Sequence, residues 1–254
     1  MAFSLLRIVV PVWVAVLPVT LQAAPVDLSA WVGEGNGQWQ LAVGDNSVLQ
    51  RRNGTPSVFH DGSNSQGRSL KGTITVDTNG DDDFIGFVLG YQAGDLTNSA
   101  ADYLLIDWKQ RTQSLGSLGT AQEGLAISRV QGVLGDDAGA WSHDSTAGVT
   151  ELARGATLGS TGWADRTTYS FDLTFSATLV EVFVDGTREL SITGQFSDGA
   201  FGFYNYSQAQ VRYAGIVEDI LPPATVPVPG ALPLLGAGLG MIGLMRRFGR
   251  YAAA

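Results

Sequence analysis

The 254-residue chain contains 15 lysine and arginine residues against 24 aspartate and glutamate residues, and its formal net charge is −9. It contains no cysteine, which excludes disulfide bonds and thiolate metal sites as sources of stability. All 24 acidic residues but only 11 basic ones lie between residues 24 and 219, so that region carries about −13. Such a region repels nucleic acid and attracts divalent cations, so we expect no nucleic-acid partner.

Residues 1–23 have the layout of a secretory signal peptide. Arg7 supplies one positive charge, an apolar run extends from Ile8 to about Leu21, and small residues follow at Ala23 and Ala24. This order is typical of a cleaved signal. The apolar run is shorter than the roughly 20 residues of a membrane helix, which favours cleavage over permanent anchoring. The sequence therefore predicts export, with cleavage between Ala23 and Ala24.

Residues 24–219 are long enough for a single domain with its own core, and they contain a series of short strand patterns. TYSFDLTF at 168–175 alternates apolar and polar residues, and LVEVFVDGTRELSI predicts two strands joined at Asp185-Gly186. Many short strands with glycine-rich turns indicate an all-β sandwich of two antiparallel sheets. Further strands are predicted at 72–76, 83–92, 102–110, 200–206 and 211–220, helical turns at 99–101 and 151–153, and loops at 138–162.

The predicted strand DFIGFVLGYQ at 83–92 is apolar on both faces, which is typical of a central strand covered on both sides. Its glycines, Gly86 and Gly90, indicate close packing against a neighbour or a bend. Three consecutive carboxylates, Asp81, Asp82 and Asp83, stand at the start of this strand. They fit either a solvated loop or a calcium site, because Ca²⁺ prefers several oxygen ligands. An EF-hand is excluded, because the segment beginning DTNGDDD lacks the required glycine and the closing glutamate.

Several segments in this order resemble the carboxy-terminal domain of thrombospondins and cartilage oligomeric matrix protein. DDDFIGFVLGYQ and YLLIDWKQ carry the resemblance, which extends from NGTPSVF at 53–59 through GLAISRV to GAFGFYNYSQAQVRYAGI. It implies a jelly roll of the concanavalin A or L-type lectin kind, extracellular calcium binding, adhesion or matrix association, and no catalytic activity. By this resemblance Asp81, Asp82 and Asp83 match the acidic run of the family and are the candidate calcium ligands.

The sequence also departs from those animal proteins. It has neither their EGF-like modules nor their aspartate-rich calcium repeats, so calcium sites shared with such repeats are not expected, and it lacks the cysteines of their domain. Asp107 stands before Trp108 where we expect an apolar residue in the animal proteins. We interpret Asp107 as a salt-bridge partner of Lys109 or Arg111, with a further cation ligand as the alternative.

A hydrolase is one alternative function, because lectin-like sandwiches include glycoside hydrolases, which need two carboxylates facing each other across a sugar. Glu181, Asp185 and Glu189 are the nearest candidates, but their spacing favours a solvated strand face and a turn. The two histidines, His60 and His143, each precede an aspartate in polar segments without any motif of a serine triad. We therefore interpret them as exposed loop residues, with a His/Asp metal site as the alternative.

A carbohydrate-binding module with structural calcium is the other alternative. Trp141 and Trp163 lie in a polar, glycine-rich region where exposed rings could stack on a sugar. Asn205 belongs to a polar patch with Ser207 and Gln208 that is either a sheet edge or a ligand site. Core packing is the competing interpretation of both tryptophans.

The end of the chain resembles the PEP-CTERM sorting signals of Gram-negative bacteria. A proline-rich linker at 220–230 contains the motif VPVP, and an apolar helix with an arginine cluster is predicted at 231–250. Positive charge after the apolar segment is expected to stay cytoplasmic, so this transmembrane helix would anchor the chain transiently in the inner membrane. The resemblance implies cleavage by an exosortase-type enzyme, although Val228 replaces the usual glutamate. The candidate sorting residues are Val226, Pro227, Pro229, Arg246 and Arg247.

Together these features predict a secreted or surface-located adhesion protein of a Gram-negative bacterium. We expect it to bind Ca²⁺, to lack enzymatic activity, and to associate with extracellular polysaccharide or a biofilm matrix. The carbohydrate-binding module is the first alternative and the glycoside hydrolase the second.

Overall fold

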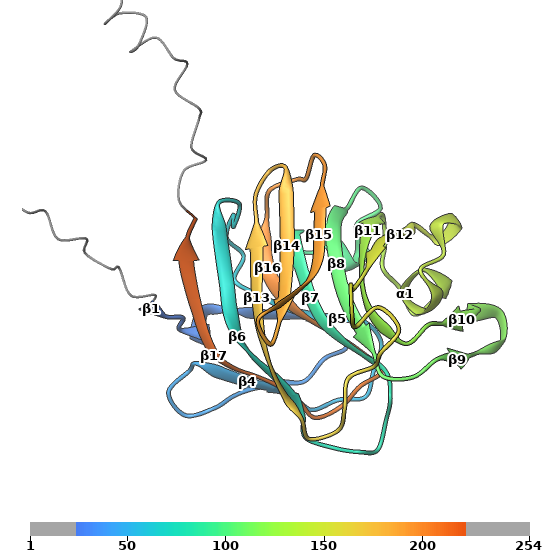
Figure 1. Ribbon diagram of the computed structural model, residues 1–254, viewed down its shortest axis with the longest axis horizontal. Coiled ribbons are helices and arrows are strands. Elements are labelled where there is room, and N and C mark those ends of the chain that lie inside the picture. Colours follow the sequence, from blue (N-terminus) through green and yellow to red (C-terminus); the bar gives the residue numbers. More distant parts are fainter. Residues whose placement is uncertain (1–23, 222–254) are drawn as a thin grey trace, which may run out of the picture. The chain divides into compact units, whose positions relative to one another are not determined.

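The structure is a computed structural model that describes residues 24–221, and there the chain forms two antiparallel β-sheets that pack face to face (Figure 1). The predicted all-β, two-sheet sandwich is confirmed. The predicted signal peptide at 1–23, the linker from residue 222 onward and the sorting signal at 231–250 lie outside the described residues. No helix within residues 24–221 is both long and apolar enough to cross a membrane.

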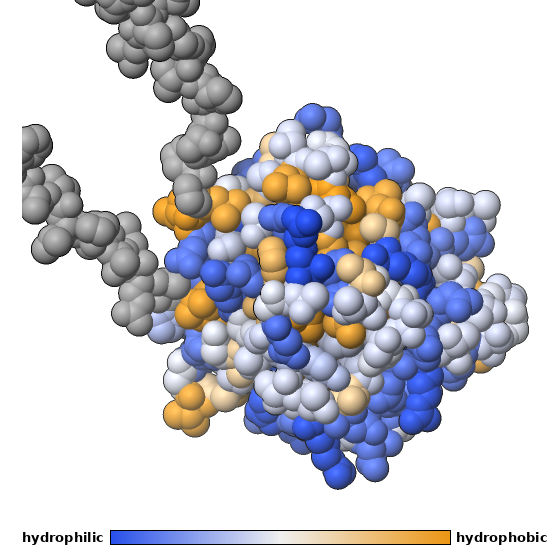
Figure 2. Space-filling view, in the orientation of Figure 1, coloured by the Kyte–Doolittle hydropathy of each residue, from blue (hydrophilic) through white to orange (hydrophobic). Residues whose placement is uncertain are grey.

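The first sheet has eight strands. One of them, β1 (Ala24–Pro25), pairs only with the carboxy-terminal strand of the domain. The other seven follow the order β15 (Thr187–Thr193), β14 (Leu179–Val184), β13 (Thr168–Phe175), β6 (Arg68–Val76), β17 (Val211–Ile220), β4 (Ser47–Gln50) and β3 (Trp39–Leu41). Figure 2 shows mostly polar and charged residues on one face of the molecule, with smaller hydrophobic groups between them.

The second sheet has seven strands, and its middle strands are the most buried. Their order is β12 (Val149–Arg154), β11 (Gly124–Gln131), β8 (Asp102–Lys109), β7 (Phe84–Tyr91), β16 (Ala200–Tyr206), β5 (Ser57–His60) and β2 (Val32–Gly35). All eight residues of β7 are buried, which confirms the predicted central strand. The remaining elements are β9 (Gln113–Ser114), β10 (Thr120–Ala121), η1 (Leu28–Ala30), η2 (Asp95–Thr97), η3 (Gly116–Leu118), η4 (Ser145–Ala147) and α1 (Ala138–Ser142).

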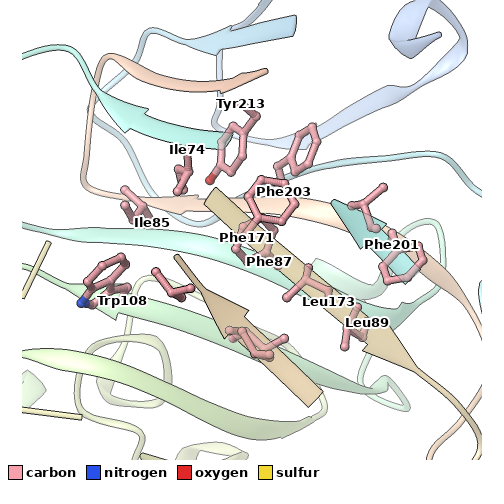
Figure 3. Close-up of a cluster of buried hydrophobic side chains, with 14 of the residues drawn as sticks. Ile74, Ile85, Phe87, Leu89, Trp108, Phe171, Leu173, Phe201, Phe203 and Tyr213 are labelled. Atoms are coloured by element: carbon pink, nitrogen blue, oxygen red, sulfur yellow. The ribbon is translucent and has the colours of Figure 1, made fainter. Parts of the chain in front are cut away.

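An aromatic core joins the two sheets (Figure 3). The rings of Phe203 and Tyr213 stack with centroids 4.2 Å apart, and Phe87 lies 4.6 Å from Phe171. The Tyr213 hydroxyl donates to the backbone oxygen of Tyr204 at 2.8 Å, so its polar end is satisfied inside the core. Burial of each such side chain stabilises the folded domain by about 1.5–3 kcal/mol.

The outer face of the second sheet is also covered, by the segment that runs from β11 through α1 to β12 (Figure 1). Trp141 of α1 packs edge-on against Phe84 of β7, and Phe84 stacks on Tyr206 of β16. Asp137 caps α1 by accepting from the backbone N–H of Gly139 at 2.9 Å. This layer explains why β7 is apolar on both faces.

Three local predictions for this region are wrong. Residues 138–162 are not simply loops, because they contain α1, η4 and β12. Residues 151–153 lie in β12, where pairing with β11 overrides local helix propensity. The helical turn expected at 99–101 occurs earlier, as η2 at 95–97.

The two glycines of β7 have the roles that the sequence predicts. A Cβ on Gly86 would lie 2.0 Å from the backbone oxygen of Ile106, so β7 and β8 approach each other closely there. Gly90 has a φ of +75°, next to a register shift between Ala200 and Phe201 of β16. Gly90 therefore allows the bend that ends the strand.

Candidate functional site

Three carboxylates meet at the loop that leads into β7. One oxygen from each of Asp81, Asp82 and Asp83 lies within 4.8 Å of the others. Asp81 and Asp82 are partly exposed, whereas the side chain of Asp83 is buried. The structure thus brings together all three residues that the sequence singled out.

A buried lysine already neutralises part of this charge. Lys109 ends β8 beside Phe84, and its side chain is completely buried. Its ammonium lies 2.6 Å from Oδ1 of Asp83 and 3.5 Å from Oδ1 of Asp82. It also donates to the backbone oxygen of Asp82 at 3.0 Å and to Gln113 at 3.1 Å.

Aromatic rings complete the surroundings of this ammonium. Its nitrogen lies 4.9 Å from the ring centroid of Trp141 and 5.2 Å from that of Phe84. Both rings favour a cation in this position. With one ammonium against three ionised carboxylates, the cluster keeps a formal charge of −2.

The remaining negative charge disfavours the ionised form of Asp81. Burial and the neighbouring charge of Asp83 raise the pKa of Asp81 to about 6. The side-chain amide of Asn53 and the backbone N–H of Asp82 both donate to Asp81, which fixes its orientation. An additional cation here would relieve the repulsion among the carboxylates.

The backbone of Asp83, the buried residue of the cluster, is held by hydrogen bonds to two buried side chains. The backbone N–H of Asp83 donates to the side-chain oxygen of Gln208 at 3.1 Å, and its backbone oxygen accepts from the indole of Trp163 at 3.0 Å. The donor set therefore consists of hard carboxylate oxygens on a fixed backbone, and it suits Ca²⁺. Asp81 and Asp82 are the more exposed ligands, whereas Asp83 is buried and one of its oxygens is engaged by Lys109.

The predicted partner of Asp107 is wrong. Asp107 is buried and accepts a hydrogen bond from Nε2 of His143 at 2.9 Å, instead of pairing with Lys109 or Arg111. The other ring nitrogen of His143 lies 3.0 Å from Glu151. His143 follows α1 with a φ of +55°, and this turn brings the imidazole to a carboxylate 36 positions earlier.

The surroundings of His143 favour the charged form of its imidazole. Burial alone lowers its pKa, but the charge of Asp107 and hydrogen bonds to Asp107 and Glu151 raise the pKa of His143 to about 10. The interpretation of both histidines as exposed loop residues is wrong, since the side chain of His143 is 7% exposed and His60 is buried. His143 ties the α1 segment to the second sheet.

The two tryptophans pack in the core, which is the competing interpretation, and none of the three candidate sugar-binding residues is exposed. Trp141 is 3% exposed, Trp163 is 2% exposed and Asn205 is fully buried. The α1 segment folds back over the second sheet and takes Trp141 into the core. Trp163 supports Asp83, and the side-chain oxygen of Asn205 accepts from Gln50. In this arrangement they support the structure, and neither ring is open to a ligand.

The hydrolase candidates do not form a facing pair. Glu181 bonds to Arg188 at 2.9 Å, and Asp185 accepts from the backbone N–H of Ser170 at the hairpin turn. Glu189 is buried and accepts from the backbone N–H groups of two residues in the loop after β12. Each carboxylate thus has a local structural partner, but the interpretation of a solvated strand face is wrong for Glu189, which is buried.

Sequence reasoning missed Lys109 as the central residue of the site. A signal was present, because the alternation in YLLIDWK places Lys109 on the same face as Tyr103 and Leu105, which are both buried. A lysine on a buried face needs a counter-charge, and the adjacent acidic run supplies one.

The comparisons with known proteins point to one family. The family model "Thrombospondin C-terminal region" matches residues 34–219. Among curated proteins, thrombospondin-3b of Danio rerio is 26% identical over an alignment of 204 residues that covers 72% of this chain and 21% of that protein. Thrombospondin-1 of Xenopus laevis is 25% identical over an alignment of 195 residues that covers 70% of this chain and 16% of that protein. The chain thus spans about a fifth of the length of these relatives or less.

Solved structures support the fold. A carbohydrate-binding module, CBM66 of Bacillus subtilis, matches with a TM-score of 0.53 at 10% identity and covers 75% of this chain and 95% of its own. The exoplasmic/lumenal domain of VIP36 in its Ca²⁺/mannose-bound form matches with a TM-score of 0.52 at 14% identity, covering 78% and 86%. At these identities the similarity establishes a lectin-like sandwich.

Proposed function

The chain belongs to the thrombospondin C-terminal family, and we propose that it is a non-enzymatic, calcium-binding adhesion domain that acts outside the cell. The observation that carries this proposal is the cluster of Asp81, Asp82 and Asp83, which keeps a formal charge of −2 after pairing with Lys109. A doubly charged cation with several oxygen ligands matches that charge.

Asp81 and Asp82 would hold the ion, together with the second carboxylate oxygen of Asp83. The bound ion would supply charge neutralisation, so the loop between β6 and β7 would be fastened to the start of the central strand. The backbone of Asp83 is already fixed by Gln208 and Trp163. Calcium would therefore order the surface around Asp81 and Asp82 without rearranging the core.

The thermal midpoint of the full chain, measured in calcium and in chelator, tests the calcium site. Binding only to the native state adds about 2.7 kcal/mol when free calcium is 100 times Kd. For a domain of 150–250 residues, this corresponds to a shift of roughly 5–11 °C. Asp82→Asn removes a ligand charge and is expected to abolish the shift.

Asp45→Asn is the matched control. Asp45 lies in the turn between β3 and β4 with a φ of +53°, which asparagine also tolerates, so the substitution removes the same charge away from the cluster. The control is expected to keep the full calcium shift. Equal midpoints with calcium and with chelator in the wild type would refute the calcium site.

Adhesion and matrix association form the cellular part of the proposal. The family, the predicted signal peptide and the predicted sorting tail support a role at the cell surface or in an extracellular polysaccharide matrix. Deletion of the gene is expected to weaken attachment of the cells to matrix, and a chain with Asp82→Asn should not restore it. Unchanged attachment after deletion would contradict adhesion while leaving calcium binding intact.

A further inference from the structure

A pocket of about 220 Å³ opens at the end of the sandwich opposite Asp81–Asp83. The acidic cluster precedes Phe84, which pairs with Tyr206 at the end of β16, whereas the pocket is lined by Phe201 at the start of β16. Arg68 at the start of β6 and Glu218 near the end of β17 also line it. The pocket is therefore separate from the proposed calcium site.

One wall of the pocket is an aromatic ring. Trp31 is partly buried, and its ring stacks on Phe203 with centroids 5.0 Å apart and planes inclined by 28°. Phe59 adds a second contact at 5.7 Å, so the indole is held in place. The buried side chains of Leu70 and Phe201 also line the pocket. The pocket thus has an apolar side built around a fixed ring.

The pocket is also lined by charged and polar side chains, among them three carboxylates. Asp61 accepts from the backbone N–H of Ser63 through Oδ1, and Glu218 accepts from Arg68 through Oε1 at 2.8 Å. The second oxygen of each carboxylate has no hydrogen bond within the described part of the chain. With Asp27, the lining carries three carboxylates against one guanidinium, a formal charge of −2.

The ionised form of Asp61 is unfavourable in this pocket, and a cationic ligand would stabilise it. Burial and the charge of Glu218 raise the pKa of Asp61 to about 6. A positive group on the ligand would offset this penalty. One N–H of the Arg68 guanidinium donates to Glu218, and the other N–H groups can donate to ligand oxygens.

We propose that this pocket binds one amino-sugar unit of an extracellular polysaccharide through its protonated amine. The volume is below the roughly 300–1,000 Å³ of pockets that enclose drug-sized ligands, which suits a single ring. The apolar face of the sugar lies on Trp31, the ammonium lies between Asp61 and Glu218, and hydroxyl groups accept from Arg68. A plain alkylammonium would leave the donors of Arg68 unused. This site goes beyond calcium binding, and the choice of an extracellular polysaccharide as its source of ligand rests on the proposed function.

Titration of the full chain with glucosamine, followed by NMR, tests the site, with glucose as the neutral probe of the same ring. We expect the indole N–H signal of Trp31, assigned through Trp31→Phe, to shift with glucosamine. A charge-assisted hydrogen bond contributes about 1.5–3 kcal/mol, so glucose should bind roughly tenfold to a hundredfold more weakly. Equal binding of the two sugars, or no binding of glucosamine, would overturn the proposal.

Asp61→Asn keeps an oxygen for the N–H of Ser63 and removes the charge, so it should weaken glucosamine binding about tenfold or more. Asp45→Asn is the control and should bind normally. Should Asp61→Asn fail to fold, the wild type serves instead, because lowering the pH from about 7 to about 5 protonates Asp61 while the amine stays charged. The charged and titratable groups that face Asp61 are Glu218, Arg68, His60 and Asp27. Affinity unchanged by both Asp61→Asn and acid would contradict the assignment.

Discussion

Replacement of Lys109 by methionine isolates the ion pair at the centre of the acidic cluster. Methionine fills a similar volume and can keep contact with Phe84 and Trp141, but it removes the ammonium. Asp83, which is 5% exposed, then loses its partner at 2.6 Å. Asp82 and Gln113 lose hydrogen bonds as well.

The expected cost is large because the remaining charge is buried. Breaking a buried ion pair by removing one partner costs about 3–5 kcal/mol. For a domain of this size, that corresponds to a fall in the thermal midpoint of roughly 6–20 °C. Asp83→Asn in the same background removes the unpaired charge and should recover part of the loss.

Urea unfolding of the wild type, both single variants and the double variant measures this coupling. We expect a coupling free energy of about 2 kcal/mol or more between Lys109 and Asp83, since the two residues are in direct contact. Lys109→Met should also bind calcium more tightly, because it changes the charge of the cluster from −2 to −3. A coupling below about 0.5 kcal/mol would refute the ion pair as the organiser of the site.

Three further predictions concern the same fold. Asp81→Asn should raise the thermal midpoint in chelator, because the raised pKa of Asp81 makes its charge unfavourable above about pH 6. It should also reduce the calcium shift, because it removes a ligand charge. A lower midpoint in chelator would contradict this. The pKa of His143 is raised from 6.5 to about 10 in the folded chain, so the charged imidazole stabilises the fold relative to His143→Gln. This stabilisation should be complete below about pH 6.5 and decline toward pH 10. A difference in unfolding free energy between the two chains that stays constant from about pH 6 to about pH 9.5 would argue against a charged imidazole. Gly86→Ala should destabilise the chain by about 2 kcal/mol or more in urea unfolding, because its Cβ would clash with Ile106, and a neutral result would mean that the strands separate easily.

The sandwich and its central strand could be predicted because local patterns determine them. Alternation in TYSFDLTF, the turn at Asp185-Gly186 and the two-faced apolar run of β7 all correspond to observed strands. The acidic cluster was also found, since its three residues are adjacent in the chain.

The contacts that depend on distant segments could not be predicted. Asp107 contacts His143 only because the α1 segment folds over the second sheet. The same packing of the α1 segment buries Trp141. The pocket brings together Trp31, Asp61 and Glu218 from parts of the chain that share no sequence pattern. Burial of polar and aromatic residues at such points follows from tertiary packing, which local periodicity does not encode.

Calorimetric titration of the full chain with calcium tests whether Asp81, Asp82 and Asp83 form a calcium site. We expect saturable binding by the wild type, unchanged binding by Asp45→Asn, and loss of binding by a chain that carries both Asp81→Asn and Asp82→Asn. Heat of binding that survives the removal of both charges would place calcium elsewhere. The absence of any binding to the wild type would mean that Lys109 is the only cation the cluster holds.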